Sequence, residues 1–173
     1  MNIEQDPEKK TPPGFDLRYT EASDVAFLKA WLIQPESVPW YPMSTEAEAE
    51  DAAQRWVSFY KLKCSLTATI EGEPCGLATL YLQPYRTLVH QCEFGIIVSN
   101  KFRNLGIGGQ LIRNIMHLAK NYFNIELLHL QVQAHNPAMR LYRRYGFREF
   151  GRQTHWLKED GVYRSRVFME RFL

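Results

Sequence analysis

Residues 93–109 read EFGIIV (Glu93–Val98), SNKF (Ser99–Phe102) and RNLGIGG (Arg103–Gly109), and this stretch decides the fold. Its first part alternates in apolar residues and predicts a strand over His90–Val98. Its last part contains three glycines and leads directly into Gly108–Tyr122, where apolar residues recur at helical spacing. A glycine turn between a strand and a helix N-terminus suits an anion, because unpaired N–H groups and partial positive charge collect there.

The glycine turn can hold a phosphate group. Gly106, Gly108 and Gly109 let the backbone approach a ligand closely, and Arg103 adds a cation. A plain helix-capping turn is the alternative that three glycines alone leave open. Two nucleotide motifs do not fit: the sequence has no Gly-Lys-Ser/Thr of a P-loop, and RxxGxGG differs from the dinucleotide fingerprint GxGxxG.

The remaining elements follow from periodicity and turn residues. Thr45 and Glu48 form a capping-box pattern that opens a helix, while the three prolines of Gln34–Met43 predict a loop without regular structure. We expect strands over Phe15–Thr20, Ser65–Ile70, Cys75–Leu82, Leu127–Val132, Phe147–Gly151 and Ser165–Phe172, and helices over Asp24–Ile33, Thr45 to about Phe59 and Asn136–Tyr145. Antiparallel strands followed by one strand–helix–strand crossover predict an α+β domain.

Composition limits the class of protein. The chain has 173 residues, is 45% hydrophobic and 23% charged, and has a formal net charge of +2, which argues for one globular domain and against nucleic-acid binding. The opening MNIEQDPEKK has no apolar segment behind it and no later run could span a bilayer, so we expect a cytoplasmic protein without membrane contact. Three cysteines without a CxxC pair predict buried free thiols and no metal. We interpret residues 1–14 as a flexible tail and residues 15–173 as the domain.

Two motifs together resemble the GNAT acyltransferase superfamily. The first is Arg103-x-x-Gly106-x-Gly108 after a strand ending in Val98, and the second is Asn136-Pro-Ala-Met-Arg-Leu-Tyr142, which continues to Gly146-Phe147. The resemblance extends over about Phe15–Leu173. It implies a single domain with a mixed, mostly antiparallel sheet of seven strands, about four helices, and fourth and fifth strands that splay apart.

The resemblance also implies an acetyl-CoA site. The turn Arg103-Asn104-Leu105-Gly106-Ile107-Gly108-Gly109 would bind the pyrophosphate, and the backbone of Ile96, Ile97 and Val98 would pair with the pantetheine amides. Asn136 matches a position that holds pantetheine or begins the helix, two compatible roles.

Acyl transfer to an amine needs a base for the amine and an acid for the departing thiolate. Tyr142 matches the family position whose hydroxyl lies near the sulfur, so it is our candidate acid, with a core aromatic as the alternative. Glu93 is our candidate base, because it alternates away from Phe94 and a partly buried carboxylate is harder to ionise than one in water. Some protein-acetylating relatives have a Glu where this chain has Gln131, which cannot be a base. His90, His129, His135 and a bound water remain alternatives.

We expect the acceptor amine to bind beside Trp40, Tyr41 and Tyr85, and the acidic stretch Glu46–Asp51 either draws a cationic amine or is a solvated helix face. Neither motif contains a cysteine, which favours direct transfer over a covalent acyl-enzyme. The predicted function is therefore an acetyl-CoA-dependent N-acetyltransferase acting on a small molecule or protein as a monomer or homodimer. A non-catalytic acyl-CoA-binding or sensing module is the alternative.

Overall fold

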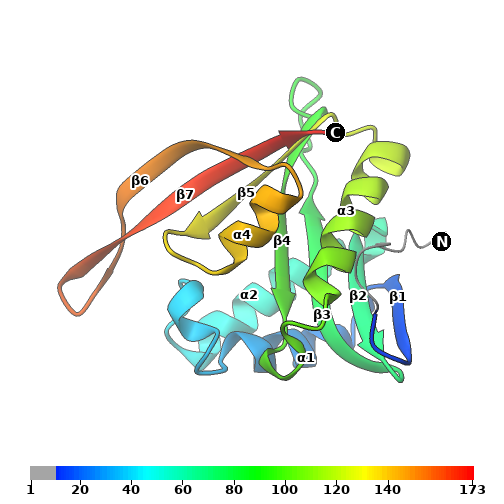
Figure 1. Ribbon diagram of the computed structural model, residues 1–173, viewed down its shortest axis with the longest axis horizontal. Helices are drawn as coiled ribbons and strands as arrows, with labels where there is room; N and C mark the ends of the chain where they lie inside the picture. Colours follow the sequence, from blue (N-terminus) through cyan, green and yellow to red (C-terminus); the bar gives the residue numbers. More distant parts are fainter. Residues whose placement is uncertain (1–10) are drawn as a thin grey trace.

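The computed structural model describes residues 11–173 (Figure 1), so most of the predicted N-terminal tail lies outside the described residues. At its described end, the carbonyl of Gly14 accepts a hydrogen bond from the amide of Glu71 at 2.9 Å. Seven strands form one sheet in the order β1-β2-β3-β4-β5-β7-β6. The strands are β1 Phe15–Tyr19, β2 Ser65–Ile70, β3 Glu73–Tyr81, β4 Gln91–Val98, β5 Leu127–Gln133, β6 Arg148–Glu159 and β7 Val162–Phe172. The α-helices are α1 Asp24–Leu32, α2 Glu46–Ser58, α3 Ile107–Phe123 and α4 Ala138–Arg144, and the short 3₁₀ helices are η1 Val38–Trp40, η2 Phe59–Leu62 and η3 Asn100–Phe102.

The sheet is antiparallel except between β4 and β5, which are parallel. These two strands pair only over three positions, from Gln91 opposite Leu127 to Glu93 opposite His129. Beyond Glu93 they diverge, as Figure 1 shows, and we call the space between their unpaired parts the β4–β5 gap. The predicted splay of the fourth and fifth strands is confirmed.

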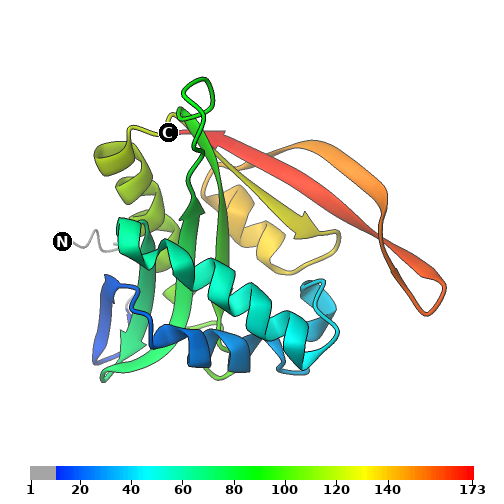
Figure 2. The same cartoon turned by 180° about the vertical axis from the view of Figure 1, so that it is seen from behind.

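Helices cover both faces of the sheet. Figure 1 shows α3 and α4 on one face, and Figure 2, from behind, shows α1 and α2 on the other. Because side chains alternate along a strand, β4 contributes to both cores. Phe94 packs in the core on the α3 face, and Ile97 packs in the core on the α1 and α2 face. One side of β4 therefore faces the helix layer of α3 and α4, and the other side faces the layer of α1 and α2. The β4–β5 gap lies between these two helix layers.

The predicted capping box starts α2. The Thr45 side chain accepts a hydrogen bond from the amide of Glu48 at 3.2 Å, and the Glu48 carboxylate accepts one from the amide of Thr45 at 2.9 Å. The acidic stretch that follows is partly neutralised within the protein, since the Lys29 ammonium lies 2.9 Å from the Glu50 carboxylate and 3.4 Å from that of Glu46. The reading of this stretch as a helix face therefore agrees with the structure.

Two elements differ from the sequence expectation. Gln34–Met43 contains the short helix η1, because Pro39 stands in its first turn, where a missing backbone N–H costs no hydrogen bond. The last two strands are longer than predicted and extend beyond the sheet as a hairpin arm (Figures 1 and 2). Most of the outer half of this arm is exposed, so no apolar alternation marks it in the sequence. The register of β6 also shifts between Gln153 and Leu157.

Two other expectations concern burial and membrane contact. Cys64, Cys75 and Cys92 are buried free thiols, as predicted. None of the helices in the described part of the chain is both long and apolar enough to span a bilayer.

Candidate functional site

The glycine turn presents a row of unpaired amide groups at the start of α3. Asn104 and Gly106 have left-handed backbones, with φ of 65° and 87°. In the part of the chain that the structure describes, no hydrogen bond is found for the amides of residues 104–108, and the first helical ones are from Gly109 and Gln110 to the carbonyl of Gly106. Left-handed residues turn successive N–H groups toward one concave side. Such an arrangement of N–H groups is suited to an anion.

Two glycines of the turn are required for different structural reasons. Gly106 is needed for its left-handed angle, which other residues reach only with strain. Gly109 is needed for packing, because a Cβ there would lie 2.7 Å from the hydroxyl oxygen of Tyr145, the residue that directly follows α4. Sequence reasoning assigned both glycines to ligand approach. The structure adds that Gly109 allows α4 to lie against α3.

The side chain of Arg103 forms hydrogen bonds with other parts of the protein. Its Nε lies 3.3 Å from the carbonyl oxygen of Val98, its Nη1 lies 3.3 Å from that of Glu36, and its Nη2 lies 3.0 Å from the hydroxyl of Ser37. These bonds tie the loop between α1 and α2 to the end of β4. Contact of Arg103 with a phosphate stays a prediction.

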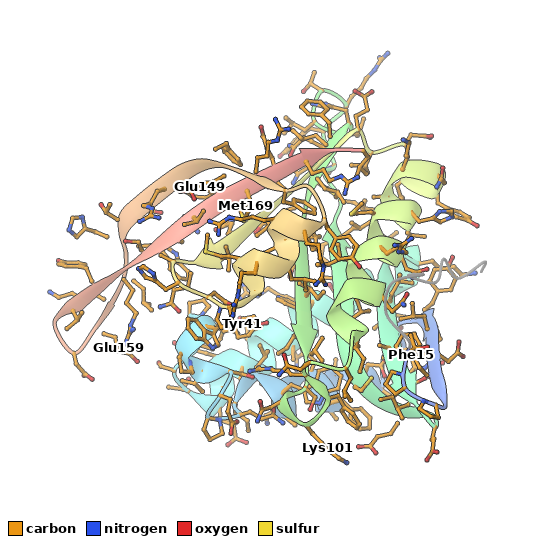
Figure 3. The ribbon with its side chains drawn as sticks, viewed as in Figure 1. Phe15, Tyr41, Lys101, Glu149, Glu159 and Met169 are labelled. Atoms are coloured by element: carbon orange, nitrogen blue, oxygen red, sulfur yellow. The ribbon has the colours of Figure 1, made fainter. Side chains whose placement is uncertain are left out.

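Beyond Glu93, the edge of β4 that faces the gap has no pairing strand in the described part of the chain. The Tyr41 hydroxyl (labelled in Figure 3) donates a hydrogen bond to the carbonyl of Ile96 at 2.9 Å, and Arg103 donates to that of Val98. Alternate residues of a strand direct their backbone groups to the same edge. Ile96 and Val98 therefore face the gap with their N–H groups, whereas the backbone of Ile97 faces β3. Two of the three predicted pantetheine partners are directed suitably.

Tyr142 lies on α4, on the α3 face of the sheet, and its ring packs against Phe94 of β4 beside the gap. It is 7% exposed, and its ring meets the rings of Phe94 and Phe147 edge-on, each at 6.3 Å between centroids. Burial raises the pKa of Tyr142, which keeps its hydroxyl protonated. Among the described residues this hydroxyl has no hydrogen-bond partner. A buried phenol with a free proton can donate it to a ligand group in the gap.

Asn136 lies two residues before α4. Its side-chain oxygen accepts a hydrogen bond from the amide of Ala138 at 2.9 Å, but Pro137 occupies the N-cap position that was predicted for Asn136. The compatible pantetheine role stays a prediction.

Glu93 lies on the opposite face of β4, with its side chain on the α2 side. The Glu93 carboxylate accepts a hydrogen bond from Nε2 of Gln131 at 2.9 Å, across the start of the gap. The Tyr81 hydroxyl is close by: burial raises the pKa of Tyr81 well above its ordinary value, and the negative charge of Glu93 raises it further. Glu93 and Tyr142 thus flank the β4–β5 gap from opposite faces of the sheet.

Aromatic side chains gather on the α2 side of the sheet, beside the gap. Trp56 on α2 lies between Tyr41 and Tyr81, with ring centroids 6.3 Å and 6.1 Å away. A Cβ at Gly95 would lie 2.8 Å from the Tyr81 hydroxyl and 2.9 Å from the Trp56 ring. Sequence reasoning found Tyr41 but missed Trp56 and Tyr81. The signal that could have found them is Gly95, because a glycine inside a strand often marks a close approach.

Gln133 was also missed. It is 5% exposed, and its buried Oε1 has no partner among the described residues. It shares a face of β5 with Gln131, two residues earlier. A buried acceptor without a donor is costly, so this atom is suited to an N–H group of a ligand.

Not all predicted residues gather here. Tyr85 is 68% exposed on the loop before β4, at the end of that strand farthest from the glycine turn. Trp40 is half-buried in η1 beside Tyr41. Of the three histidine alternatives, His129 bonds to Gln91 at 2.6 Å and burial lowers its pKa, while His90 and His135 are exposed. In the described residues, no group of three or more His, Cys, Asp or Glu side chains could hold a metal ion.

Comparisons with known proteins agree with this geometry. Residues 25–147 match the Acetyltransferase (GNAT) family. An N-alpha-acetyltransferase of Sulfurisphaera tokodaii is 37% identical over 131 residues, which cover 68% of this chain and 70% of that protein. The L-amino acid N-acetyltransferase AaaT of Escherichia coli (strain K12) is 29% identical over 107 residues, which cover 61% of this chain and 66% of that protein, just under two thirds of its length.

Solved structures share the fold. A putative phosphinothricin N-acetyltransferase superposes with a TM-score of 0.81 at 20% identity, covering 92% of this chain and 98% of the other. A ribosomal-protein-alanine N-acetyltransferase of Brucella melitensis superposes with a TM-score of 0.75 at 22% identity, covering 91% and 99%. Identities this low show the fold alone.

Proposed function

This chain belongs to the acetyltransferase (GNAT) family, and on that premise we propose that it transfers the acetyl group of acetyl-CoA directly to an α-amino group. Members of this family are acyl-CoA-dependent acetyltransferases, so acetyl-CoA is the cosubstrate. The observation that carries the proposal is the β4–β5 gap. Candidate groups for binding and for proton transfer lie beside this gap on both faces of the sheet.

The residues on the α3 face fit acetyl-CoA. The free amides of residues 104–108 would hold the pyrophosphate, because five N–H groups at a helix N-terminus complement its negative charge. The outward amides of Ile96 and Val98 would pair with pantetheine carbonyls. When bound, acetyl-CoA supplies the acetyl group as an activated thioester.

Two side chains are suited to the proton transfers. Glu93 would take a proton from the acceptor ammonium on the α2 side, directly or through a water. Tyr142 would give its proton to the departing thiolate on the other side, since its hydroxyl has no other partner among the described residues. Direct transfer is favoured because burial raises the pKa of the Cys64 thiol to about 11 and those of Cys75 and Cys92 to about 12, far from a reactive thiolate.

The acceptor class rests on the relatives and on the lining of the gap. Two relatives are named for an L-amino acid and for the N-alpha position. An ammonium group would be attracted by Glu93 and by the faces of Tyr41 and Trp56. The same lining would not serve a module that only binds acyl-CoA, so it favours catalysis over that alternative.

The test is an acceptor panel. The protein is incubated with acetyl-CoA and free L-amino acids, peptides with free N-termini, N-terminally blocked peptides containing lysine, or polyamines, and thiol release and product mass are measured. We expect acetylation at α-amino groups, and preference for amino acids or peptides separates the two kinds of acceptor. Acetylation only of lysine side chains or polyamines would overturn the α-amino assignment.

The non-catalytic alternative has its own signature. It predicts no thiol release with any amine, together with stabilisation of about 2.7 kcal/mol by acetyl-CoA at a hundred times its dissociation constant. That combination would overturn the proposed transfer while retaining the cosubstrate site.

A further inference from the structure

We propose that Arg166 is a positioning residue that acts through Gln131 to hold the Glu93 carboxylate at the β4–β5 gap. The inference deepens the proposed function and rests on its assignment of Glu93. Neither Arg166 nor Gln131 needs to touch the acceptor for this role.

A line of side-chain hydrogen bonds crosses four strands at the gap. The Arg166 guanidinium on β7 donates to Oε1 of Gln131 on β5, and its Nε donates to Oε1 of Gln153 on β6 at 2.9 Å. Gln131 then donates from Nε2 to the Glu93 carboxylate on β4, also at 2.9 Å. The line ends on the candidate base.

The chemistry of the end groups sets the orientation of the Gln131 amide. A guanidinium can only donate hydrogen bonds and an ionised carboxylate can only accept them. Gln131 must therefore direct its oxygen to Arg166 and its NH₂ group to Glu93. With Arg166 removed, the amide loses this constraint and can rotate away from the carboxylate.

The line of side-chain hydrogen bonds lies where β4 and β5 are no longer paired through their backbones. The last pair between β4 and β5 joins Glu93 to His129, and the strands part beyond it. Gln131 is the next residue of β5 on the same face. Its side chain thus links the strands at the position where the backbone ladder has ended, which places the link at the mouth of the gap.

Arg166 is itself held in place. Its guanidinium carbon lies 5.4 Å from the ring centroid of Trp156 and 4.9 Å from that of Phe168, both on the hairpin formed by β6 and β7. Cation–π contacts of this length restrict a long side chain. The hairpin arm is therefore coupled to the candidate base through Arg166.

Three titratable groups near Glu93 are held in their neutral forms. Burial raises the pKa values of Tyr81 on β3 and Cys92 on β4, and burial lowers that of His129 on β5. Glu170 on β7 lies opposite His129. Arg166 is the cation that side-chain hydrogen bonds through Gln131 connect to Glu93.

The experiment compares Arg166→Met with Arg164→Met as the matched control. Arg164 is two residues away on the same strand, and its partner is the exposed Glu159 near the tip of the arm (labelled in Figure 3). We expect Arg166→Met to lower kcat/KM by about tenfold and to move its acidic limb to higher pH, because the Glu93 carboxylate then loses the hydrogen bond that Gln131 donates to it. Acetyl-CoA affinity should stay unchanged, and Arg166→Lys should recover part of the rate.

A second background separates positioning from folding. In Glu93→Gln, the further change Arg166→Met should have no additional effect on kcat/KM, because the group it positions is gone. An equal loss in both backgrounds would overturn the proposal. A wild-type pH profile for Arg166→Met, found together with an impaired Glu93→Gln, would also overturn the proposal. That result would leave the assignment of Glu93 as the base intact. A wild-type rate and pH profile for Glu93→Gln itself would instead overturn the base, a separate failure of the proposed function.

Discussion

Replacing Tyr142 by Phe should separate catalysis from folding. The change removes one oxygen atom and leaves the ring, which packs against Phe94 and Phe147 in a residue that is only 7% exposed. Aromatic pairs of this kind contribute about 0.5–1.5 kcal/mol each, and both remain in the variant. No donor or acceptor among the described residues loses a partner, which avoids the usual penalty of about 1–3 kcal/mol.

The expected cost to folding is therefore small and the cost to activity large. We expect the free energy of unfolding to change by less than about 0.5 kcal/mol, which corresponds to a Tm shift under about 2 °C for a chain of this size. Loss of a general acid should lower the rate of the chemical step by about 10² to 10⁴-fold. That range equals about 3–5 kcal/mol in activation free energy.

The assay is single-turnover thiol release, which reports the chemical step, together with thermal unfolding and acetyl-CoA binding. Tyr122→Phe is the matched control, because Tyr122 is 57% exposed on α3, away from the gap. Tyr41→Phe loses the hydrogen bond to Ile96 and should cost about 1 kcal/mol of stability. A wild-type single-turnover rate for Tyr142→Phe would refute the acid assignment and leave the residue a packing role.

Two further predictions concern stability. Arg18→Met removes the guanidinium that lies 2.8 Å from the Asp24 carboxylate, which is 1% exposed, and should cost about 3–5 kcal/mol at neutral pH in urea unfolding. Burial raises the pKa of Asp24, but hydrogen bonds from Arg18 and the backbone outweigh this effect and leave the pKa below its ordinary value. The stabilisation by the ion pair is therefore present above about pH 4 and lost below it. Below that pH, the stability of the variant should approach that of the wild type. Gly109→Ala forces a Cβ to within 2.7 Å of the Tyr145 hydroxyl and should lower stability by about 1–3 kcal/mol; an unchanged Tm would show that Tyr145 moves aside freely.

Features that depend on neighbouring residues were predictable. The capping box of Thr45 and Glu48 needs residues three apart, and the left-handed Gly106 follows from a glycine at a helix start. Gly146 ends α4 with a φ of 80°, as a glycine after a helix does. The alternation of apolar residues that includes Phe94 likewise predicts β4 from neighbouring residues alone. Burial of one face and chain stereochemistry act over a few residues, so the sequence carries these signals directly.

Features that join distant residues were decided only by the tertiary structure. Tyr41 lies 55 positions from Ile96, Gln131 lies 38 from Glu93, and Arg166 lies 35 from Gln131, and in each case the partner depends on strand order and register. A one-residue change of register would turn Gln131 to the other face of β5 and away from Glu93. The sequence therefore predicted the binding turn and the family, whereas the packing of β5 and β7 beside the gap determined which side chains surround the candidate base.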